Sequence, residues 1–183
     1  MKKITFLLTF LYSFSCMECY AADAYNYTPY VGMDYTYNHT KAHGFSPKYS
    51  AGGLYIGSMY SPYFGTELFF NQSNRHKKNI QNTKIKTSYR SYGLDVLAYL
   101  PLGCAQKLSA IATAGIGEYV FNQKILPQKH HNEHGFGYRF GGGIKFALSK
   151  NWQTRFITRY VKFNHVSGYN HSLEHTLSFE YHF

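Results

Sequence analysis

The sequence is poor in charged residues, in cysteine and in long apolar runs. Charged residues make up 15% of its 183 positions, well below the quarter that is usual for soluble proteins. It has three cysteines and one tryptophan, against 19 tyrosines and 15 phenylalanines. Beyond residues 4–14, no apolar run approaches the length of a membrane helix. These absences exclude a helical membrane protein. Abundant aromatics without long apolar runs are typical of strands that place every second residue against lipid.

The N-terminus has the pattern of an export signal. Two lysines precede the apolar residues 4–14, and Ala22-Asp23-Ala24 is an A-x-A cleavage motif. Cleavage after Ala21 is the alternative. We predict a cleaved signal peptide at residues 1–24 and one domain at residues 25–183. The mature chain then keeps a single cysteine, Cys104, which excludes an internal disulfide.

The chain is strongly basic. Its net charge is +10, and it stays at +10 without residues 1–24, because cleavage removes two lysines and two acids. Such a surface favours anionic lipid, lipopolysaccharide or polysaccharide as partners. Nucleic acid is the other usual partner of a basic domain. We expect no nucleic acid here, because an exported chain meets little of it.

The remainder of the chain alternates apolar and polar residues with a period of two. This pattern predicts eight strands, at 27–37, 48–59, 64–72, 86–100, 108–120, 136–148, 152–163 and 172–183. Three connectors are short, at 60–63, 101–107 and 149–151, whereas four are longer and polar, at 38–47, 73–85, 121–135 and 164–171. Short periplasmic turns and long external loops are typical of outer-membrane barrels. We therefore predict an all-β fold: an eight-stranded antiparallel up-and-down transmembrane β-barrel.

The same alternation assigns most charged residues of the strands to the inside. An eight-stranded barrel is just filled by its own side chains, and unpaired charges there would be costly. We therefore predict an interior ionic network, and no open pore, from residues that share the inward parity: Asp34, Glu67, Asp95, Arg139, Lys145, Arg155, Arg159, Glu174 and Glu180. The strand at 108–120 is ambiguous, because Ala110, Ala112 and Ala114 alternate with Ile111, Thr113 and Gly115. Glu118 therefore stays unassigned.

Several short motifs resemble one family. They are Tyr30-Val31-Gly32-Met33-Asp34-Tyr35, Gly53-Leu54-Tyr55-Ile56-Gly57, Ser61-Pro62-Tyr63-Phe64-Gly65-Thr66-Glu67, Tyr92-Gly93-Leu94-Asp95-Val96, Ala114-Gly115-Ile116-Gly117 and the terminal Tyr181-His182-Phe183. In this order they resemble the small eight-stranded outer-membrane barrels related to the OmpA membrane domain and the opacity-like surface antigens. The resemblance implies a bacterial outer-membrane location with loops outside the cell. It also implies that Phe183 is read by the barrel-assembly machinery, although Phe183 equally suits the end of a lipid-facing aromatic girdle.

Candidate chemistry is sparse. His175 is near Ser172 and Ser178 in sequence, but its parity is opposite to theirs, so we expect no catalytic site. Eight of the ten histidines fall in or beside the long connectors: His39, His43, His76, His130, His131, His134, His165 and His171. His130, His131 and His134 form the best local group for a transition metal. The alternatives are tolerated polar loop residues or a pH-sensitive loop cluster.

Basic residues concentrate in the second long connector. Arg75, Lys77 and Lys78 would contact a polyanion, either lipopolysaccharide phosphates or host sulfated glycans. The alternative is anchoring to head groups of the protein's own membrane. We predict a non-enzymatic surface protein that supports membrane integrity and adheres to a host glycan or protein, with no cofactor. The alternatives are a narrow small-solute channel and a lipid-modifying enzyme.

Overall fold

The computed structural model describes residues 27–42, 48–74, 76–80, 83–102, 107–125, 129–164 and 169–183. Residues 42, 76–80, 83–86, 123–125 and 129–132 are described by their backbone alone. The predicted signal peptide, Arg75, His43, Cys104 and His165 lie outside the described residues.

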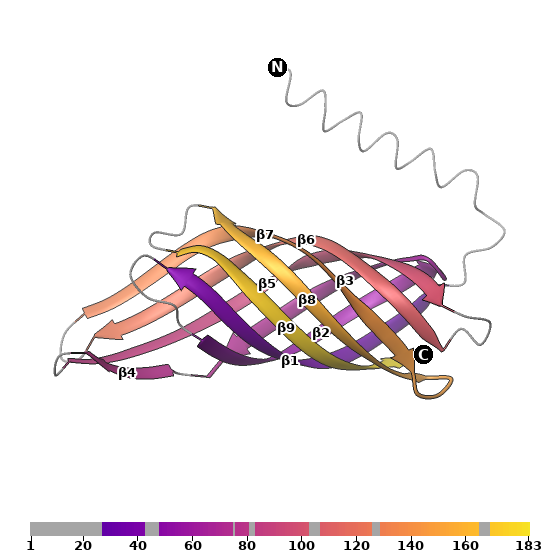
Figure 1. Ribbon diagram of the computed structural model, residues 1–183, viewed down its shortest axis with the longest axis horizontal. Coiled ribbons are helices and arrows are strands. Elements are labelled where there is room, and N and C mark those ends of the chain that lie inside the picture. The colour runs from indigo at the N-terminus through magenta and orange to yellow at the C-terminus, as the bar shows by residue number, and fades with distance from the viewer. Residues whose placement is uncertain are drawn as a thin grey trace, which may run out of the picture.

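The described chain forms one antiparallel sheet that closes on itself (Figure 1). Its strands are β1 (Thr28–Ala42), β2 (Lys48–Ser61), β3 (Phe64–Ser73), β4 (His76–Ile80), β5 (Thr83–Leu102), β6 (Leu108–Ile125), β7 (Lys129–Ala147), β8 (Trp152–Asn164) and β9 (Tyr169–His182). Their order is β3-β2-β1-β9-β8-β7-β6-β5-β4, and a β3–β5 pairing closes the ring. The predicted eight-stranded antiparallel barrel is confirmed. Closure pairs both sides of the strands that form the ring, whereas β4 pairs with β5 alone.

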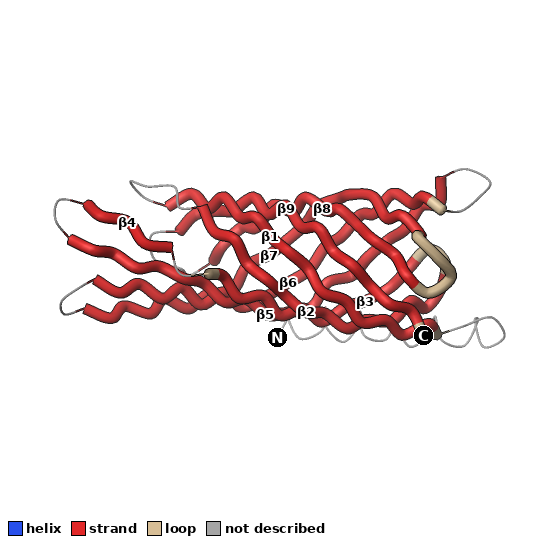
Figure 2. Tube along the Cα trace, turned by 90° about the horizontal axis from the view of Figure 1, so that it is seen from below, coloured by secondary structure: helices blue, strands red, loops and turns tan. Residues whose placement is uncertain are grey.

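The strand additional to the predicted eight is β4, which continues the path of β3. Both β3 and β4 pair with β5, through Gln72↔Arg90 and then His76↔Thr87. Residues 74–75 separate the two strands, so β4 adds a short extension to the barrel wall and does not widen it. Figure 2 shows β4 beside the far end of β5, beyond the closed cylinder.

The prediction of two of the long loops is wrong, because most of the residues concerned lie in strands. The connector predicted at 73–85 contains β4 and the start of β5, and that predicted at 121–135 contains the ends of β6 and β7. The register continues to Ile125↔Lys129, so residues 126–128 alone connect β6 and β7. These segments are polar and lack an apolar face, yet cross-strand pairing satisfies their backbone amides and carbonyls. Six of the eight histidines assigned to loops therefore lie on strands: His39, His76, His130, His131, His134 and His171.

The outer face of the barrel is apolar. Alternate side chains expose large hydrophobic surfaces, for example Met33 at 63%, Leu54 at 61% and Phe140 at 56%. A contiguous apolar surface of this extent is compatible with hydrocarbon and not with water. No helix among the described residues is long and apolar enough to cross a membrane.

The ambiguous strand is resolved by its neighbours. In β6, Ile111 and Thr113 are buried, whereas Ala112 and Ala114 are exposed. The alanines therefore face lipid, and Glu118, with the same parity, lies on the outer face as well. Sequence alone could not decide this, because neither parity of the strand is clearly more apolar than the other.

Candidate functional site

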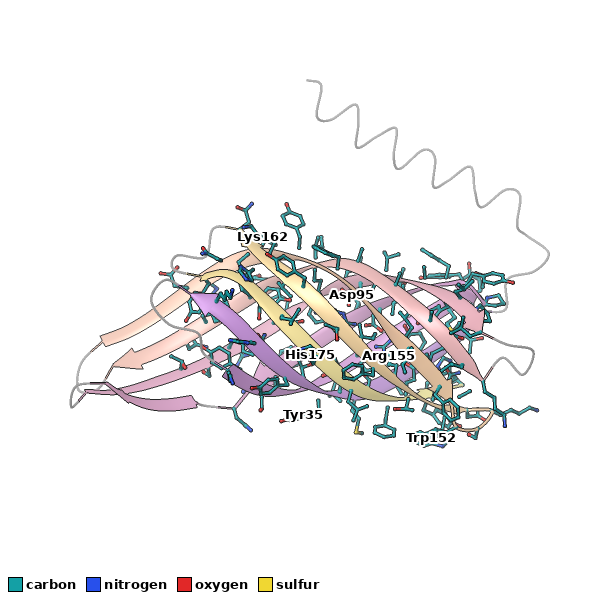
Figure 3. All side chains as sticks on the ribbon, viewed as in Figure 1. Tyr35, Asp95, Trp152, Arg155, Lys162 and His175 are labelled. Atoms are coloured by element: carbon teal, nitrogen blue, oxygen red, sulfur yellow. The ribbon has the colours of Figure 1, made fainter. Side chains whose placement is uncertain are left out.

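The lumen contains buried ion pairs contributed by five strands. Arg155 of β8 lies at the centre of one group: its Nη2 is 2.6 Å from Glu67 Oε2 of β3, and its Nη1 is 3.6 Å from Glu180 Oε2 of β9. The same guanidinium lies 4.2 Å from the ring centroid of Tyr55. Each of the three charged side chains is only 1% exposed. Figure 3 labels Arg155 within the barrel.

A second group is contiguous with the first. Asp95 of β5 forms ion pairs with two arginines: Arg139 Nε lies 3.1 Å from Asp95 Oδ1, and Arg159 Nη2 lies 3.2 Å from Asp95 Oδ2. Arg159 also reaches Glu67 Oε1 at 3.5 Å, and Arg139 Nη2 lies 3.9 Å from Glu174 Oε2. Glu67 and Asp95 are also direct cross-strand partners in the β3–β5 pairing. Two adjacent carboxylates would repel each other, and the three arginines offset that repulsion.

Asp34 and Lys145 lie on inward positions without an ion pair between them. The side-chain amide of Asn71 donates to Asp34 Oδ1 at 3.0 Å. Lys145 Nζ lies 4.1 Å from the ring centroid of Tyr99 and 3.7 Å from Met59 Sδ. All nine residues that the sequence assigned to the interior thus have inward positions. Asp34 is half-buried and the other eight are buried.

The charges of this network nearly balance. The nine residues comprise five acids and four bases. His182 Nε2 lies 3.0 Å from Glu180 Oε1, which gives this carboxylate a second partner beside Arg155. Paired charges with additional hydrogen bonds are the condition under which a water-poor interior tolerates ions. This arrangement can hold the wall together across the lumen, and it fills the path that a solute would take.

The sequence prediction missed an aromatic cluster inside the barrel. Its buried members include Tyr49, Tyr89, Tyr119, Phe121, Phe163 and Tyr169. The Phe121 ring stacks on Tyr169 at 4.1 Å and meets Phe163 edge-on at 5.4 Å. These residues share the inward parity of the predicted network, which could have identified them. Phe121 lies in the segment 121–135 that is predicted to be a loop, where strand parity does not apply.

The hairpins at the end opposite the short turns carry a row of basic residues. The register aligns Lys77 with Lys86, Lys86 with Lys124, and Lys124 with His130, across β4, β5, β6 and β7. Lys77 is thus part of this row, Lys78 lies opposite Ile85, and Arg75 lies outside the described residues. Neighbouring strands are about 4.8 Å apart. Like charges directly opposite each other destabilise a sheet.

The structure does not assemble the predicted histidine group as a metal site. His130 and His131 lie on β7 where its backbone alone is described, and His134 Nδ1 lies 3.5 Å from Glu118 Oε1. Among the described residues, no group of three or more His, Cys, Asp or Glu could hold a metal ion.

His175 and the two serines lie on opposite sides of the wall. Ser172 and Ser178 are buried in the lumen, whereas His175 faces outward and its Nδ1 lies 3.0 Å from Thr158 Oγ1. The three side chains therefore cannot act on one substrate.

Phe183 belongs to an aromatic girdle at the short-turn end of the barrel. Its ring meets Tyr181 edge-on at 5.3 Å, and Tyr181 meets Trp152 at 5.1 Å. Phe183 is 71% exposed on the outer face. Aromatic rings at this level are typical of the membrane–water interface of transmembrane barrels.

A closed eight-stranded barrel with an apolar exterior and a packed ionic interior is a transmembrane barrel of the outer-membrane class. Residues 6–183 match the model of the outer membrane protein beta-barrel domain, and the chain belongs to that family. The protein is therefore located in the bacterial outer membrane. A search of curated proteins found no relative by sequence.

Solved structures share this fold at low sequence identity. The neisserial surface protein A structure matches with a TM-score of 0.69 and 14% identity over 85% of this chain and 97% of that one. Ail of Yersinia pestis, solved with the heparin analogue sucrose octasulfate, matches with a TM-score of 0.63 and 14% identity over 86% and 99%. A major outer membrane protein of Thermus thermophilus matches with a TM-score of 0.56 and 12% identity over 84% and 99%. At these identities the likeness concerns the fold alone.

Proposed function

We propose that the protein is a non-enzymatic surface protein that binds polyanions through the basic row of its external hairpins, Lys77–Lys86–Lys124–His130. The observation that carries the proposal is the register, which puts three lysines in adjacent strands. Such a row costs free energy in the isolated sheet. An anionic chain with closely spaced sulfates or phosphates would neutralise these lysines. Relief of their mutual repulsion would then add to the free energy of binding.

Two further observations support a polyanion. The net charge of the chain is +10, and the inward arginines are already paired with acids, so the excess positive charge lies elsewhere. The fold relative Ail was solved with a heparin analogue bound. A sulfated host glycan is therefore our first choice of partner, and adhesion is the activity that follows from it.

We expect binding to immobilised heparin to depend on this row. The double variant Lys86→Gln/Lys124→Gln should reduce affinity by about tenfold, because each exposed ion pair contributes up to about 1 kcal/mol. Binding should weaken steeply with added salt, because exposed charges are screened. The measurement is surface plasmon resonance of the purified barrel in detergent over heparin at several salt concentrations.

The matched control is Lys107→Gln/Lys150→Gln. It removes the same charge from exposed lysines at the short-turn end of the barrel. Equal losses in both variants would mean that net charge alone drives binding, and the basic row would then have no specific role.

The chemistry of the lumen also argues against a channel. The ionic network and the aromatic cluster occupy successive levels of the interior. We expect the wild-type barrel to give flat current traces in planar lipid bilayers under conditions in which a general porin conducts. Discrete conductance steps that persist after removal of contaminating porins would contradict this.

Phe183 is proposed as a contact of the barrel-assembly machinery as well as a girdle residue. The proposal rests on its position directly after β9, a strand of alternating inward and outward residues, and on its own outward-facing side chain. Lipid and lipopolysaccharide are the remaining proposed partners, through the outer face and the external rim.

A further inference from the structure

A shallow groove crosses the lipid-facing wall over β3, β5, β6 and β7. Its volume is about 460 Å³, and apolar atoms form nearly all of its lining. Leu68, Leu94 and Ile116 border one side, and these residues are successive partners in the sheet register. Gly93 and Gly117 contribute to the lining between the two sides. A groove of this shape on a membrane-facing wall can accept one acyl chain of a neighbouring lipid.

The other side of the groove contains an acid. Tyr92, Glu118 and Phe136 are successive partners in the register. Among the described residues, Glu118 is the one carboxylate on an outward-facing strand position. Charged groups on the lipid face destabilise a transmembrane barrel unless they lie near the interface. An outward acid beside an apolar groove therefore calls for an explanation.

Neighbouring groups hold this carboxylate in place. The Tyr92 hydroxyl donates to Glu118 Oε2 at 2.5 Å, and His134 Nδ1 lies 3.5 Å from Oε1. A carboxylate offers about four acceptor positions, so these two contacts leave room for another donor. Glu118 keeps 30% of its side chain exposed.

The position along the strands places this acid at the external interface. Glu118 is the eleventh residue of β6 counted from the short-turn end, and Tyr92 is the eleventh of β5 counted from the same end. A tilted strand crosses the hydrocarbon in about 9–11 residues. Two residues further toward the external end, the outward-facing positions of β5, β6 and β7 are Arg90, Val120 and His134, which are successive partners in the register. Arg90 and His134 are exposed. Two potential cations thus lie at head-group level just beyond the acid.

We propose that this wall binds a lipid whose head group carries both a phosphate and a primary ammonium, as in phosphoethanolamine. One acyl chain lies in the groove, Arg90 and His134 contact the phosphate, and Glu118 accepts a hydrogen bond from the ammonium. A lipid with phosphate alone would satisfy the cations but would gain nothing from Glu118. This site is separate from the basic row and does not depend on the polyanion proposal.

Native mass spectrometry of the purified barrel tests the site. The barrel is incubated with an equimolar mixture of phosphatidylethanolamine and phosphatidylglycerol with identical acyl chains, and retained lipids are counted. Wild type should retain the ethanolamine lipid over the glycerol lipid by about tenfold, the gain expected of one charge-assisted hydrogen bond. In Glu118→Gln, which can still accept from Tyr92, the ratio should fall to about one.

Two further variants distinguish the contribution of the lipid head group from that of the acyl chain. Ile116→Trp fills the groove and should reduce retention of both lipids equally. His175→Gln alters an outward polar residue on β9, away from the groove, and should leave the ratio unchanged. Equal retention of both lipids by wild type, an unchanged ratio in Glu118→Gln, or normal retention in Ile116→Trp would overturn the proposal.

Discussion

Replacement of Arg155 by methionine is expected to lower the free energy of unfolding by about 3–5 kcal/mol. Arg155 is the shared partner of Glu67 and Glu180, and its guanidinium also packs on Tyr55. Without it, two buried carboxylates lose a counter-charge in an interior from which water is largely excluded. The measurement is urea unfolding of the barrel in lipid vesicles. The fluorescence of the chain's single tryptophan, Trp152, is the reporter, and this side chain lies on the outer face.

Two comparisons distinguish lost pairing from lost packing. Lys107→Met removes an exposed cation and should change the free energy of unfolding by less than about 0.5 kcal/mol. The double variant Arg155→Met/Glu67→Gln removes one of the stranded charges and should recover part of the loss. A double variant no more stable than Arg155→Met would show that packing against Tyr55, and not charge pairing, dominates.

The second large effect is expected from a glycine on the inward side of β7. A Cβ at Gly143 would collide with the carbonyl oxygen and carbon of Phe156 and would lie 2.7 Å from the Cα of Ile157. These are backbone atoms of β8, so the neighbour cannot yield by changing a rotamer. Gly143→Ala is expected to lower the free energy of unfolding by about 2–3 kcal/mol, the upper part of the range for overpacking. The same urea titration measures it.

Gly52→Ala is the matched control. A Cβ at Gly52 meets nothing within 4 Å, because this glycine faces outward on β2. Its substitution should leave stability within about 0.5 kcal/mol of wild type. Equal effects at Gly52 and Gly143 would indicate that glycine contributes through backbone freedom and not through the close approach of β7 and β8.

The alternation of apolar and polar residues along each strand was the sequence pattern that predicted most of the fold. It identified eight strands, and it assigned an inward position to residues as far apart as Asp34, Arg139 and Glu180. It succeeded because lipid on one side and a confined lumen on the other impose opposite requirements on successive residues. The structure has the predicted inward and outward positions wherever lipid and lumen differ strongly in polarity.

Alternation failed where the two environments are alike. Beyond the membrane both faces of a hairpin are polar, so residues 121–135 were interpreted as a loop although most of them are paired strand. In β6 small apolar residues occupy both parities, so the outward position of Glu118 was not predictable. The contact of Glu118 with Tyr92 and His134 joins three strands, and no spacing in the sequence reports it.

The sequence by itself determined the class of fold and the separation of lipid-facing from inward residues, because both follow from the period of two along each strand. The tertiary structure alone decided the register, and the register decides which charges meet. Arg155 contacts Glu67 across 88 positions of sequence, and Lys77, Lys86 and Lys124 become neighbours through strand pairing. A shift of one residue would exchange every inward and outward side chain of a strand, so both proposed binding sites depend on the register.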